Sequence, residues 1–204
     1  MNNLTKTAFL IILFLLFNPL SANETPIDSV DSYLNAVQSL VKSKDSFKED
    51  FLDIEFLLHK NKHAQGKEKV QTLLNLYTAY IYKSGEIANN YNDQAMALAE
   101  KLAFKEGILK ANYNRAYFMF VLGDFEESMK MVLEIQKVVG ATTYEEIYAD
   151  ISTLKSYIYS ERGEYDRALE TGLKLLDSAE KSKNDYLLMK ANSALSHYYL
   201  RIEN

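Results

Sequence analysis

The sequence predicts an all-α protein, organised as an α-α superhelix in which antiparallel helix hairpins stack one on the next. Three observations lead to this prediction: a sequence pattern recurs after forty residues, apolar residues recur at helical spacing, and both prolines precede Ile27. A repeat period of this length is typical of stacked supersecondary units. Because proline is the strongest helix breaker, its absence from residue 27 onward favours long helices.

The composition fits one globular domain and excludes several classes of protein. Of 204 residues, 48% are hydrophobic and 25% are charged, a balance that permits a buried core. The net charge of −5 and the scattered lysines argue against direct nucleic-acid binding, which needs a basic surface. The absence of cysteine excludes disulfides, thiolate metal ligands and a thiol nucleophile.

Residues 1–22 have the composition of a signal peptide. Lys6 precedes an uncharged apolar core, residues 8–17, which ends before Pro19. This core is about half the length of the roughly 20 residues that a membrane-spanning helix needs. Small residues at its end predict cleavage after Ala22, which would make the protein periplasmic or secreted. An uncleaved signal anchor is the alternative.

Residues 23–66 are predicted to form an N-terminal helical cap or a diverged repeat. Apolar residues recur at helical spacing over 27–42 and again over 47–60, and a polar turn follows. His59 and His63 are four residues apart, a spacing that can hold a metal ion on one helical face. Because no third ligand is near them in the sequence, a solvated helix end is the favoured interpretation.

The rest of the chain divides into four units. They span residues 67–104, 105–141, 142–183 and an incomplete 184–204. In the first unit, one helix is expected to end near Gly85, Ile87 to Asn92 are expected to lengthen the turn, and the second helix carries Ala95 to Leu102. The next two units are predicted to contain helices at 105–122, 125–139, 143–162 and 165–182, and a last helix is predicted to begin near Asp185.

Two stretches, Gly123 to Lys130 and Gly163 to Glu170, carry the repeat most clearly. Each glycine is expected to adopt the left-handed conformation that reverses the chain, and the acid after it to begin the next helix. Small residues on both helices are expected to let them approach closely. The motif positions are Ala116, Gly123, Phe125, Ser128, Ser156, Tyr159, Gly163, Tyr165 and Ala168.

This pattern resembles the tetratricopeptide repeat family, with a looser match in the first unit at Thr78, Gly85 and Ala95. The period of forty residues exceeds the 34 common in that family, and the closing proline of each repeat is missing. In these respects the chain resembles the longer-helix variants in exported N-terminal sensor regions of Bacteroidetes-type histidine kinases and regulators. The resemblance implies a protein- or peptide-binding scaffold that forms the periplasmic sensing portion of a larger signalling protein. A stand-alone secreted or periplasmic scaffold that assembles a protein complex is the alternative.

The resemblance also implies which residues bind the ligand, because the first helix of each pair lines the concave face in this family. The corresponding residues here are Tyr82, Lys110, Tyr113, Asn114, Tyr117, Phe120, Tyr157 and His197. Tyrosine suits such a face because it combines a large contact area with a hydrogen-bonding tip. The alternative is that several of these tyrosines belong to the core. The Lys/Asn/Arg clamp of chaperone-binding members is not reproduced, so a C-terminal carboxylate is not the expected ligand.

No motif for catalysis or cofactor binding is present. The sequence lacks a nucleophile elbow and a glycine-rich phosphate loop, and paired acids such as Glu126 and Glu127 stand at positions expected to be solvated. We therefore expect a protein or peptide partner, no cofactor, no bound metal and no enzymatic activity.

The repeat also leads to an expectation about the C-terminus. Glu203 stands forty residues after Gly163, so the chain stops where the next turn would begin. Helical arrays are normally closed by a capping helix. We therefore expect that this chain is the front part of a longer protein, with membrane contact only through a missing C-terminal segment or an uncleaved signal anchor.

Overall fold

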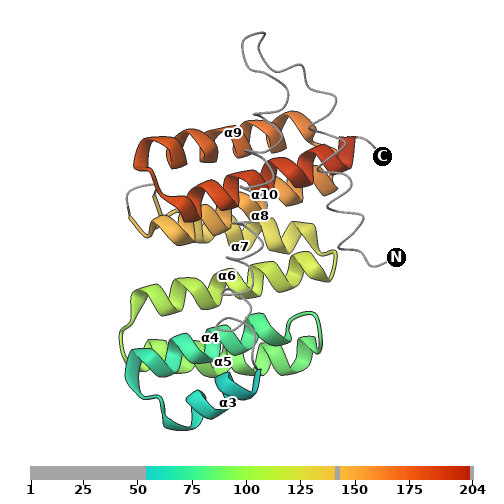
Figure 1. Cartoon of the computed structure of the whole chain (residues 1–204). Helices are drawn as coiled ribbons and strands as arrows, with labels where there is room; N and C mark the ends of the chain where they lie inside the picture. Colours follow the sequence, from blue (N-terminus) through green and yellow to red (C-terminus); the bar gives the residue numbers. More distant parts are fainter. Residues whose placement is uncertain (1–53, 141–142, 203–204) are drawn as a thin grey trace, which may run out of the picture. The chain divides into compact units, whose positions relative to one another are not determined.

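The structure of the protein, a computed structural model, describes residues 54–140 and 143–202. These belong to one compact unit, Leu52–Asn204, and the predicted all-α class is confirmed for them. The signal segment and the helix expected over 27–42 lie outside the described residues. The helices of the described part (Figure 1) are α3 (Ile54–His63), α4 (Gly66–Tyr80), α5 (Gly85–Lys101), α6 (Lys105–Val121), α7 (Phe125–Gln136), α8 (Glu145–Glu161), α9 (Tyr165–Ser182) and α10 (Asp185–Ile202).

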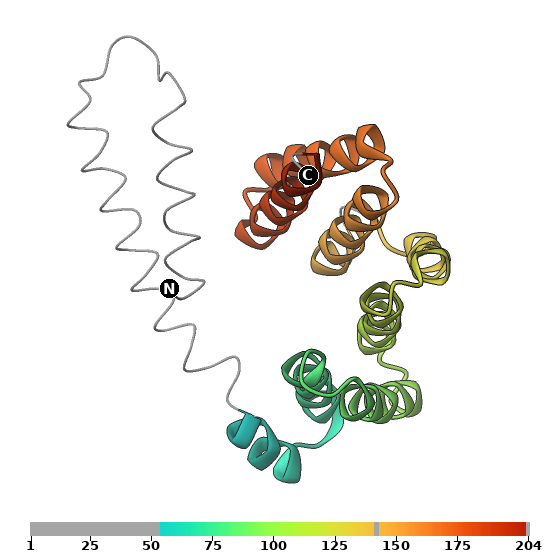
Figure 2. The same ribbon diagram turned by 90° about the vertical axis from the view of Figure 1, so that its right-hand side faces the viewer.

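Consecutive helices pack against each other as antiparallel pairs, so the described part is an array of helix hairpins (Figure 1). A second set of contacts joins alternate helices: α4 packs on α6, α6 on α8, and α8 on α10. Figure 2 shows the helices nearly end-on, with α8 and α10 on the inner side and α7 and α9 on the outer side. The first helices of the successive hairpins are α4, α6, α8 and α10, and they form one row.

The forty-residue period extends one hairpin further back than expected. Helices α5, α7 and α9 begin at Gly85, Phe125 and Tyr165, and Ser84 caps α5 by accepting a hydrogen bond from the Ile87 amide at 3.4 Å. The prediction that Ile87 to Asn92 lengthen the turn is therefore wrong, because Ser84 starts the helix at the position held by Asp124 forty residues later.

Gly85 is also not the turn glycine of its hairpin. It occupies the position of the aromatic residue at the start of α7 and α9, and a Cβ built on it would lie 2.7 Å from the Phe118 ring. The place of the turn glycine is taken by Lys83. Gly85 therefore allows α5 and α6 to pack closely at Phe118.

The expected left-handed glycines are confirmed in the next two hairpins. Gly123 has φ 81° and Gly163 has φ 74°. The acid after Gly123 caps α7, because the Asp124 carboxylate accepts a hydrogen bond from the Glu127 amide at 3.1 Å. Glu164 makes no such bond to the backbone of α9 and instead forms an ion pair with Arg162 at 2.9 Å.

The small motif residues bring the paired helices into direct hydrogen-bonding contact. The Ser128 hydroxyl donates to the Ala116 carbonyl at 2.8 Å, and the Ser156 hydroxyl donates to the Ala168 carbonyl at 3.0 Å. All four residues are fully buried. Serine and alanine therefore exchange places between the two repeats, and one hydroxyl joins the helices of each hairpin.

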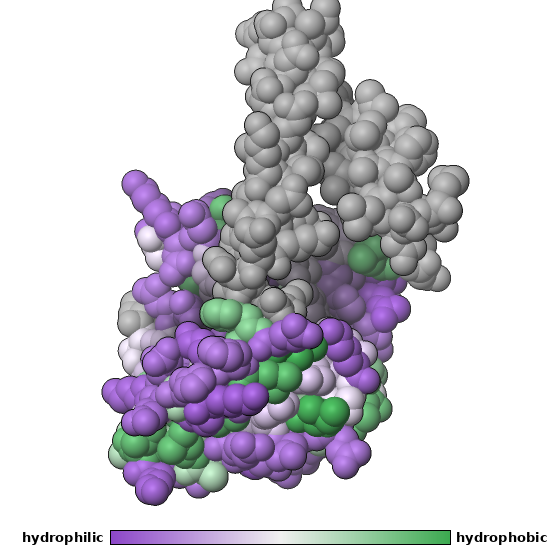
Figure 3. All heavy atoms as spheres, turned by 60° about the horizontal axis from the view of Figure 1, so that its bottom comes forward, coloured by the Kyte–Doolittle hydropathy of each residue, from purple (hydrophilic) through white to green (hydrophobic). Residues whose placement is uncertain are grey.

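The apolar core runs through the array as a series of clusters between neighbouring helices. The largest joins α6 to α9 and is centred on Ile151, Leu154 and Ile158 of α8, which are almost completely buried. Among the coloured residues in Figure 3, hydrophilic side chains prevail, and hydrophobic ones gather in small patches between them. None of the helices in the described ranges is both long and apolar enough to cross a membrane.

Candidate functional site

The row of first helices places most of the predicted binding residues on neighbouring elements. Lys110, Tyr113, Tyr117 and Phe120 follow one another at spacings of three and four in α6, so they share one face of that helix. Tyr82 follows the end of α4, Tyr157 lies in α8 and His197 in α10. All except Asn114, discussed below, are partly or fully exposed.

The aromatic members of this set form a row of rings in contact, which we call the aromatic stripe, and its members on α6 also pack against the core. It consists of Tyr82, Tyr113, Tyr117, Phe120, Tyr157 and His197. Ring centroids are 6.2 Å apart for Tyr113 and Tyr117, 6.0 Å for Tyr117 and Phe120, 5.9 Å for Phe120 and Tyr157, and 4.4 Å for Tyr157 and His197. The hydroxyls of Tyr82 and Tyr117 hydrogen-bond to each other and join α4 to α6.

The stripe is most open at its α4 end. Tyr82 is 75% exposed, whereas the other members are half-buried. The Tyr157 hydroxyl shares a hydrogen bond with the Ser193 hydroxyl at 2.5 Å. The stripe therefore presents apolar ring area with hydroxyl groups at its edge, a combination that is enriched where proteins bind one another.

The tyrosines in the middle of the stripe are uncharged at neutral pH. Burial raises the pKa of the Tyr117 phenol, and the hydrogen bond and charge of Tyr82 raise it further. Burial likewise raises the pKa of Tyr113 well above its ordinary value, with a smaller effect from the Asp150 carboxylate. These hydroxyls therefore act as hydrogen-bonding groups and not as acids.

Charged residues lie beside the stripe on α6 and at its α10 end. Lys110 forms ion pairs with Glu106 at 2.9 Å and Glu146 at 3.3 Å. Burial alone lowers the pKa of Lys110, but its bonds to the two glutamates outweigh this effect and raise the pKa overall. At the α10 end, Glu161 accepts hydrogen bonds from His197 at 2.9 Å and from Arg201 Nε at 2.8 Å.

Asn114 does not belong to this face, so its prediction as a binding residue is corrected. Its side chain is only 8% exposed, and its Nδ2 donates to the Oδ1 of Asn92 on α5 at 2.9 Å. The Asn92 Nδ2 in turn donates to the Ala111 carbonyl at 3.0 Å. Asn114 is adjacent to Tyr113 in the chain, but successive residues point about 100° apart around a helix, which turns Asn114 into the α5–α6 interface.

The sequence-based prediction missed a polar cluster between α8 and α10. Asp150 is 8% exposed, accepts a hydrogen bond from the Tyr186 hydroxyl at 2.7 Å and forms an ion pair with Lys190 Nζ at 2.6 Å. Burial, followed by the charge and hydrogen bond of Asp150, raises the pKa of Tyr186. The cluster therefore links α10 to α8 through polar side chains.

Several contacts between consecutive first helices share one spacing along the chain, which the structure reveals. Four polar pairs between consecutive first helices are 36 residues apart: Lys110 with Glu146, Asp150 with Tyr186, Tyr157 with Ser193, and Glu161 with His197. This is four residues less than the repeat period. Neighbouring first helices are therefore offset by about one helical turn.

The two histidines of α3 lie at the exposed end of that helix, with their rings 4.9 Å apart. In the part of the chain that the structure describes, no group of three or more His, Cys, Asp or Glu side chains is placed to hold a metal ion.

Comparison with known proteins identifies no relative. No protein-family model, curated protein or solved structure matches the chain.

Proposed function

We propose that this chain is a protein-interaction scaffold that binds an extended peptide along the aromatic stripe. The observation that carries the proposal is the continuity of the stripe. Its rings follow one another at centroid distances of 4.4–6.2 Å from α6 to α10, and Tyr82 extends it to the end of α4.

The chemistry of the stripe favours a peptide with apolar or aromatic side chains. Aromatic rings at a protein surface provide a large contact area at a low cost in side-chain entropy and are enriched among the residues that dominate binding energy. Because the central tyrosines are uncharged, a charged segment gains little there. The glutamates beside Lys110 offer polar contacts along the α6 part of the stripe, and the Glu161–Arg201 pair offers them at its α10 end.

We also propose that the array is of the tetratricopeptide type. Several features support this: helix starts forty residues apart, left-handed glycines at Gly123 and Gly163, and fully buried small residues at Ser128 and Ala168. In addition, the first helices of successive hairpins contact one another, as expected for stacked repeats.

Selection of peptides from a random displayed library on the full chain tests the proposed function. Affinities of selected peptides are then measured by fluorescence anisotropy for the wild type and for a Tyr82→Ala/Tyr157→Ala variant. Truncating an aromatic residue that dominates binding costs about 2 kcal/mol, so the double variant is expected to raise Kd at least tenfold.

Tyr199→Ala is the matched control. Tyr199 lies on α10, is 54% exposed and contacts Tyr198, which is not part of the stripe, so its removal is expected to leave Kd within twofold. Failure to select any peptide, or equal binding by the wild type and the double variant, would contradict the proposal. Circular dichroism of each variant verifies that the helices are retained.

For the biological context, we propose that the scaffold is exported and forms the sensing portion of a larger signalling protein. The apolar segment of residues 8–17 and the resemblance to exported sensor regions support this. The reading frame after the codon for Asn204 distinguishes this context from a stand-alone scaffold. A continuing frame that encodes a hydrophobic segment and a kinase or regulator domain is expected, whereas a stop codon supports the scaffold.

N-terminal sequencing of the exported protein tests cleavage after Ala22.

A further inference from the structure

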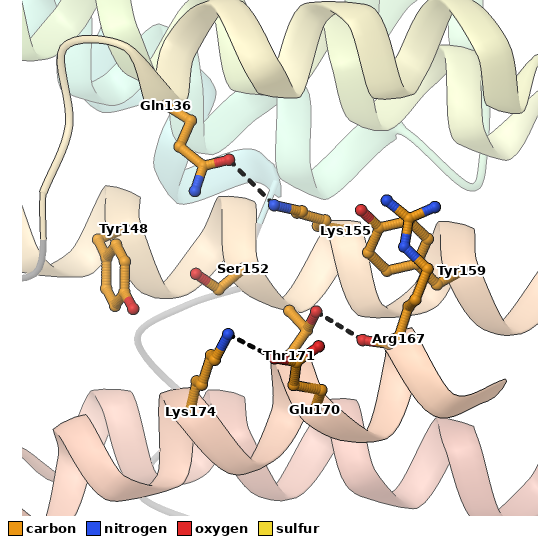
Figure 4. Close-up of a pocket in the computed structure, with 9 residues that line it drawn as sticks. All are labelled: Gln136, Tyr148, Ser152, Lys155, Tyr159, Arg167, Glu170, Thr171 and Lys174. Carbon is orange, nitrogen blue, oxygen red and sulfur yellow. Dashed lines mark hydrogen bonds and ion pairs between the residues drawn. The ribbon is translucent and has the colours of Figure 1, made fainter. Parts of the chain in front are cut away.

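A pocket lined by cations opens on a side of α8 that faces away from the aromatic stripe. It has a volume of about 240 Å³ and lies between α8 and α9, beside the end of α7 (Figure 4). Lys155, which lines the pocket, and Tyr157 of the stripe are two residues apart, so they point about 200° apart around the helix. The pocket is therefore a separate site, and the inference drawn from it does not depend on peptide binding.

The charged residues of the pocket are three cations and one acid. Lys174 forms an ion pair with Glu170 at 2.7 Å, and Arg167 forms one with Glu164, which lies outside the pocket. Lys155 makes no ion pair with any residue in the described ranges. Its Nζ donates instead to the neutral Oε1 of Gln136 at 3.1 Å. The pocket is thus positively charged in a protein whose net charge is −5.

The repeat provides an internal comparison for Lys155. Forty residues earlier, the equivalent cation is Arg115, which binds Asp93 of α5 at 2.8 Å. Forty residues after Asp93 stands Leu133, so the later hairpin keeps the cation but has an apolar residue in place of its acid. One repeat further on, Leu195 replaces the cation as well. Among these equivalent positions, Lys155 is the cation that forms no ion pair with a residue in the described ranges.

The surroundings of Lys155 also favour an anion. Burial lowers the pKa of Lys155, the positive charges of Arg167 and Lys174 lower it further, and the smaller effect of the Glu170 carboxylate does not reverse this. A bound anion would relieve this repulsion. The hydroxyls of Tyr148 and Ser152 face the same pocket (Figure 4), and neither hydrogen-bonds to another residue that the structure describes, so both are available to donate to a ligand.

We propose that the pocket binds a small anion through carboxylate or phosphate oxygens, with Lys155 as the central cation and Arg167 and Lys174 on either side. Ammonium and guanidinium groups form strong charge-assisted hydrogen bonds with both kinds of oxygen. The volume of the pocket is below the range of about 300–1,000 Å³ typical of sites for drug-sized ligands. The ligand is therefore a small molecule that carries one or two such groups.

Isothermal titration calorimetry of the full chain with inorganic phosphate, and separately with succinate, at constant ionic strength tests the proposal. Saturable binding of at least one anion is expected, and the one with the lower Kd shows whether the site prefers phosphate or carboxylate. Lys155→Gln is expected to raise Kd at least tenfold. Leu133→Asp, which offers Lys155 the acid that Arg115 has, is expected to do the same while every cation remains in place.

Lys130→Gln is the matched control, because it removes an equal charge from an exposed lysine on α7 whose partner is Glu127. It is expected to change Kd less than twofold. Three results would overturn the proposal: no saturable binding of either anion by the folded wild type, unchanged binding by Lys155→Gln, or an equal loss in Lys130→Gln, which would indicate a general effect of charge.

Discussion

At the residue scale, two buried side-chain amides join α5 to α6. Asn92 is fully buried, donates to the Ala111 carbonyl and accepts from Asn114. At the positions forty and eighty residues after Asn92, the chain has Val132 and Gly172. The pair is therefore specific to one interface of the array, where hydrogen bonds compensate for the cost of burying polar groups.

This pair leads to a prediction about stability. Asn92→Leu leaves the Asn114 side-chain amide without its acceptor in the core and removes the bond from Asn92 to the Ala111 carbonyl, which is expected to lower the free energy of unfolding by about 1–3 kcal/mol. The double variant Asn92→Leu/Asn114→Leu is expected to lose less than the sum of the two single variants. Urea denaturation measures all three, and simple additivity would show that the two side chains do not interact.

His197 leads to a prediction about pH. It lies beside the Tyr157 ring, Glu161 and Arg201. Burial lowers the pKa of His197 below its ordinary value of 6.5, although the charge and hydrogen bond of Glu161 oppose this, and Arg201 lowers it further. The unfolded chain therefore takes up this proton first as the pH falls, so His197 makes the native state less stable as the pH decreases through the window just below 6.5.

The measurement is the free energy of unfolding of the wild type and of His197→Asn between about pH 7.5 and pH 5. Relative to the variant, the wild type is expected to lose stability as the pH falls. His63→Asn, at the exposed end of α3, is the control and should follow the wild-type curve. A wild type that gains stability relative to His197→Asn at low pH would show that Glu161 dominates the shift.

At the element scale, the α6–α7 and α8–α9 turns depend on glycine for backbone reasons alone. Gly123 and Gly163 have positive φ, and a Cβ built on either meets no atom within 4 Å. Alanine at either position is therefore expected to lower the free energy of unfolding by about 1–2 kcal/mol, the cost of a left-handed conformation for a residue with a side chain. Thermal or urea denaturation measures this loss.

Gly140→Ala is the control for that prediction. Gly140 also has open space around its Cβ position, but it is not among the residues with positive φ. Alanine there is expected to stabilise the protein by about 0.4–1 kcal/mol, because it reduces the freedom of the unfolded chain. A stabilising effect of alanine at all three positions would contradict the assigned turn conformations.

At the scale of the whole described array, stability is distributed unevenly among the helices. Helix α8 packs against α6, α7, α9 and α10, whereas α3 packs only against α4 among the described helices. In arrays of this kind, each unit is stabilised by its own hairpin and by its immediate neighbours. The middle of the array should therefore open least often.

Hydrogen exchange followed by mass spectrometry tests this distribution. Amides of α8 around Ile151 and Leu154, which belong to the largest core cluster, are expected to exchange most slowly, and amides of α3 most rapidly. This order of exchange rates is expected because a helix with fewer neighbours loses fewer contacts when it detaches, so it opens more often. The same rate of opening for all helices would instead indicate a single cooperative unit.

The sequence by itself determined the features that follow local rules. Helix type follows from apolar spacing and the position of proline, and the turns follow from Gly123 and Gly163, which adopt the expected left-handed backbone. The forty-residue period predicted where the clear hairpins begin. The aromatic members of the candidate face were also predictable, because residues three or four apart in one helix share a side of it.

Only the tertiary structure decided which side of each helix meets which neighbour. Helix α6 packs against α4, α5, α7 and α8, so adjacent residues can have different roles: Tyr113 joins the stripe, whereas Asn114 is buried against Asn92. The repeat period did not reveal the one-turn offset between first helices that joins Asp150 to Tyr186. The physical reason is that period and propensity act along the chain, whereas burial and pairing depend on the distance and rotation between helices.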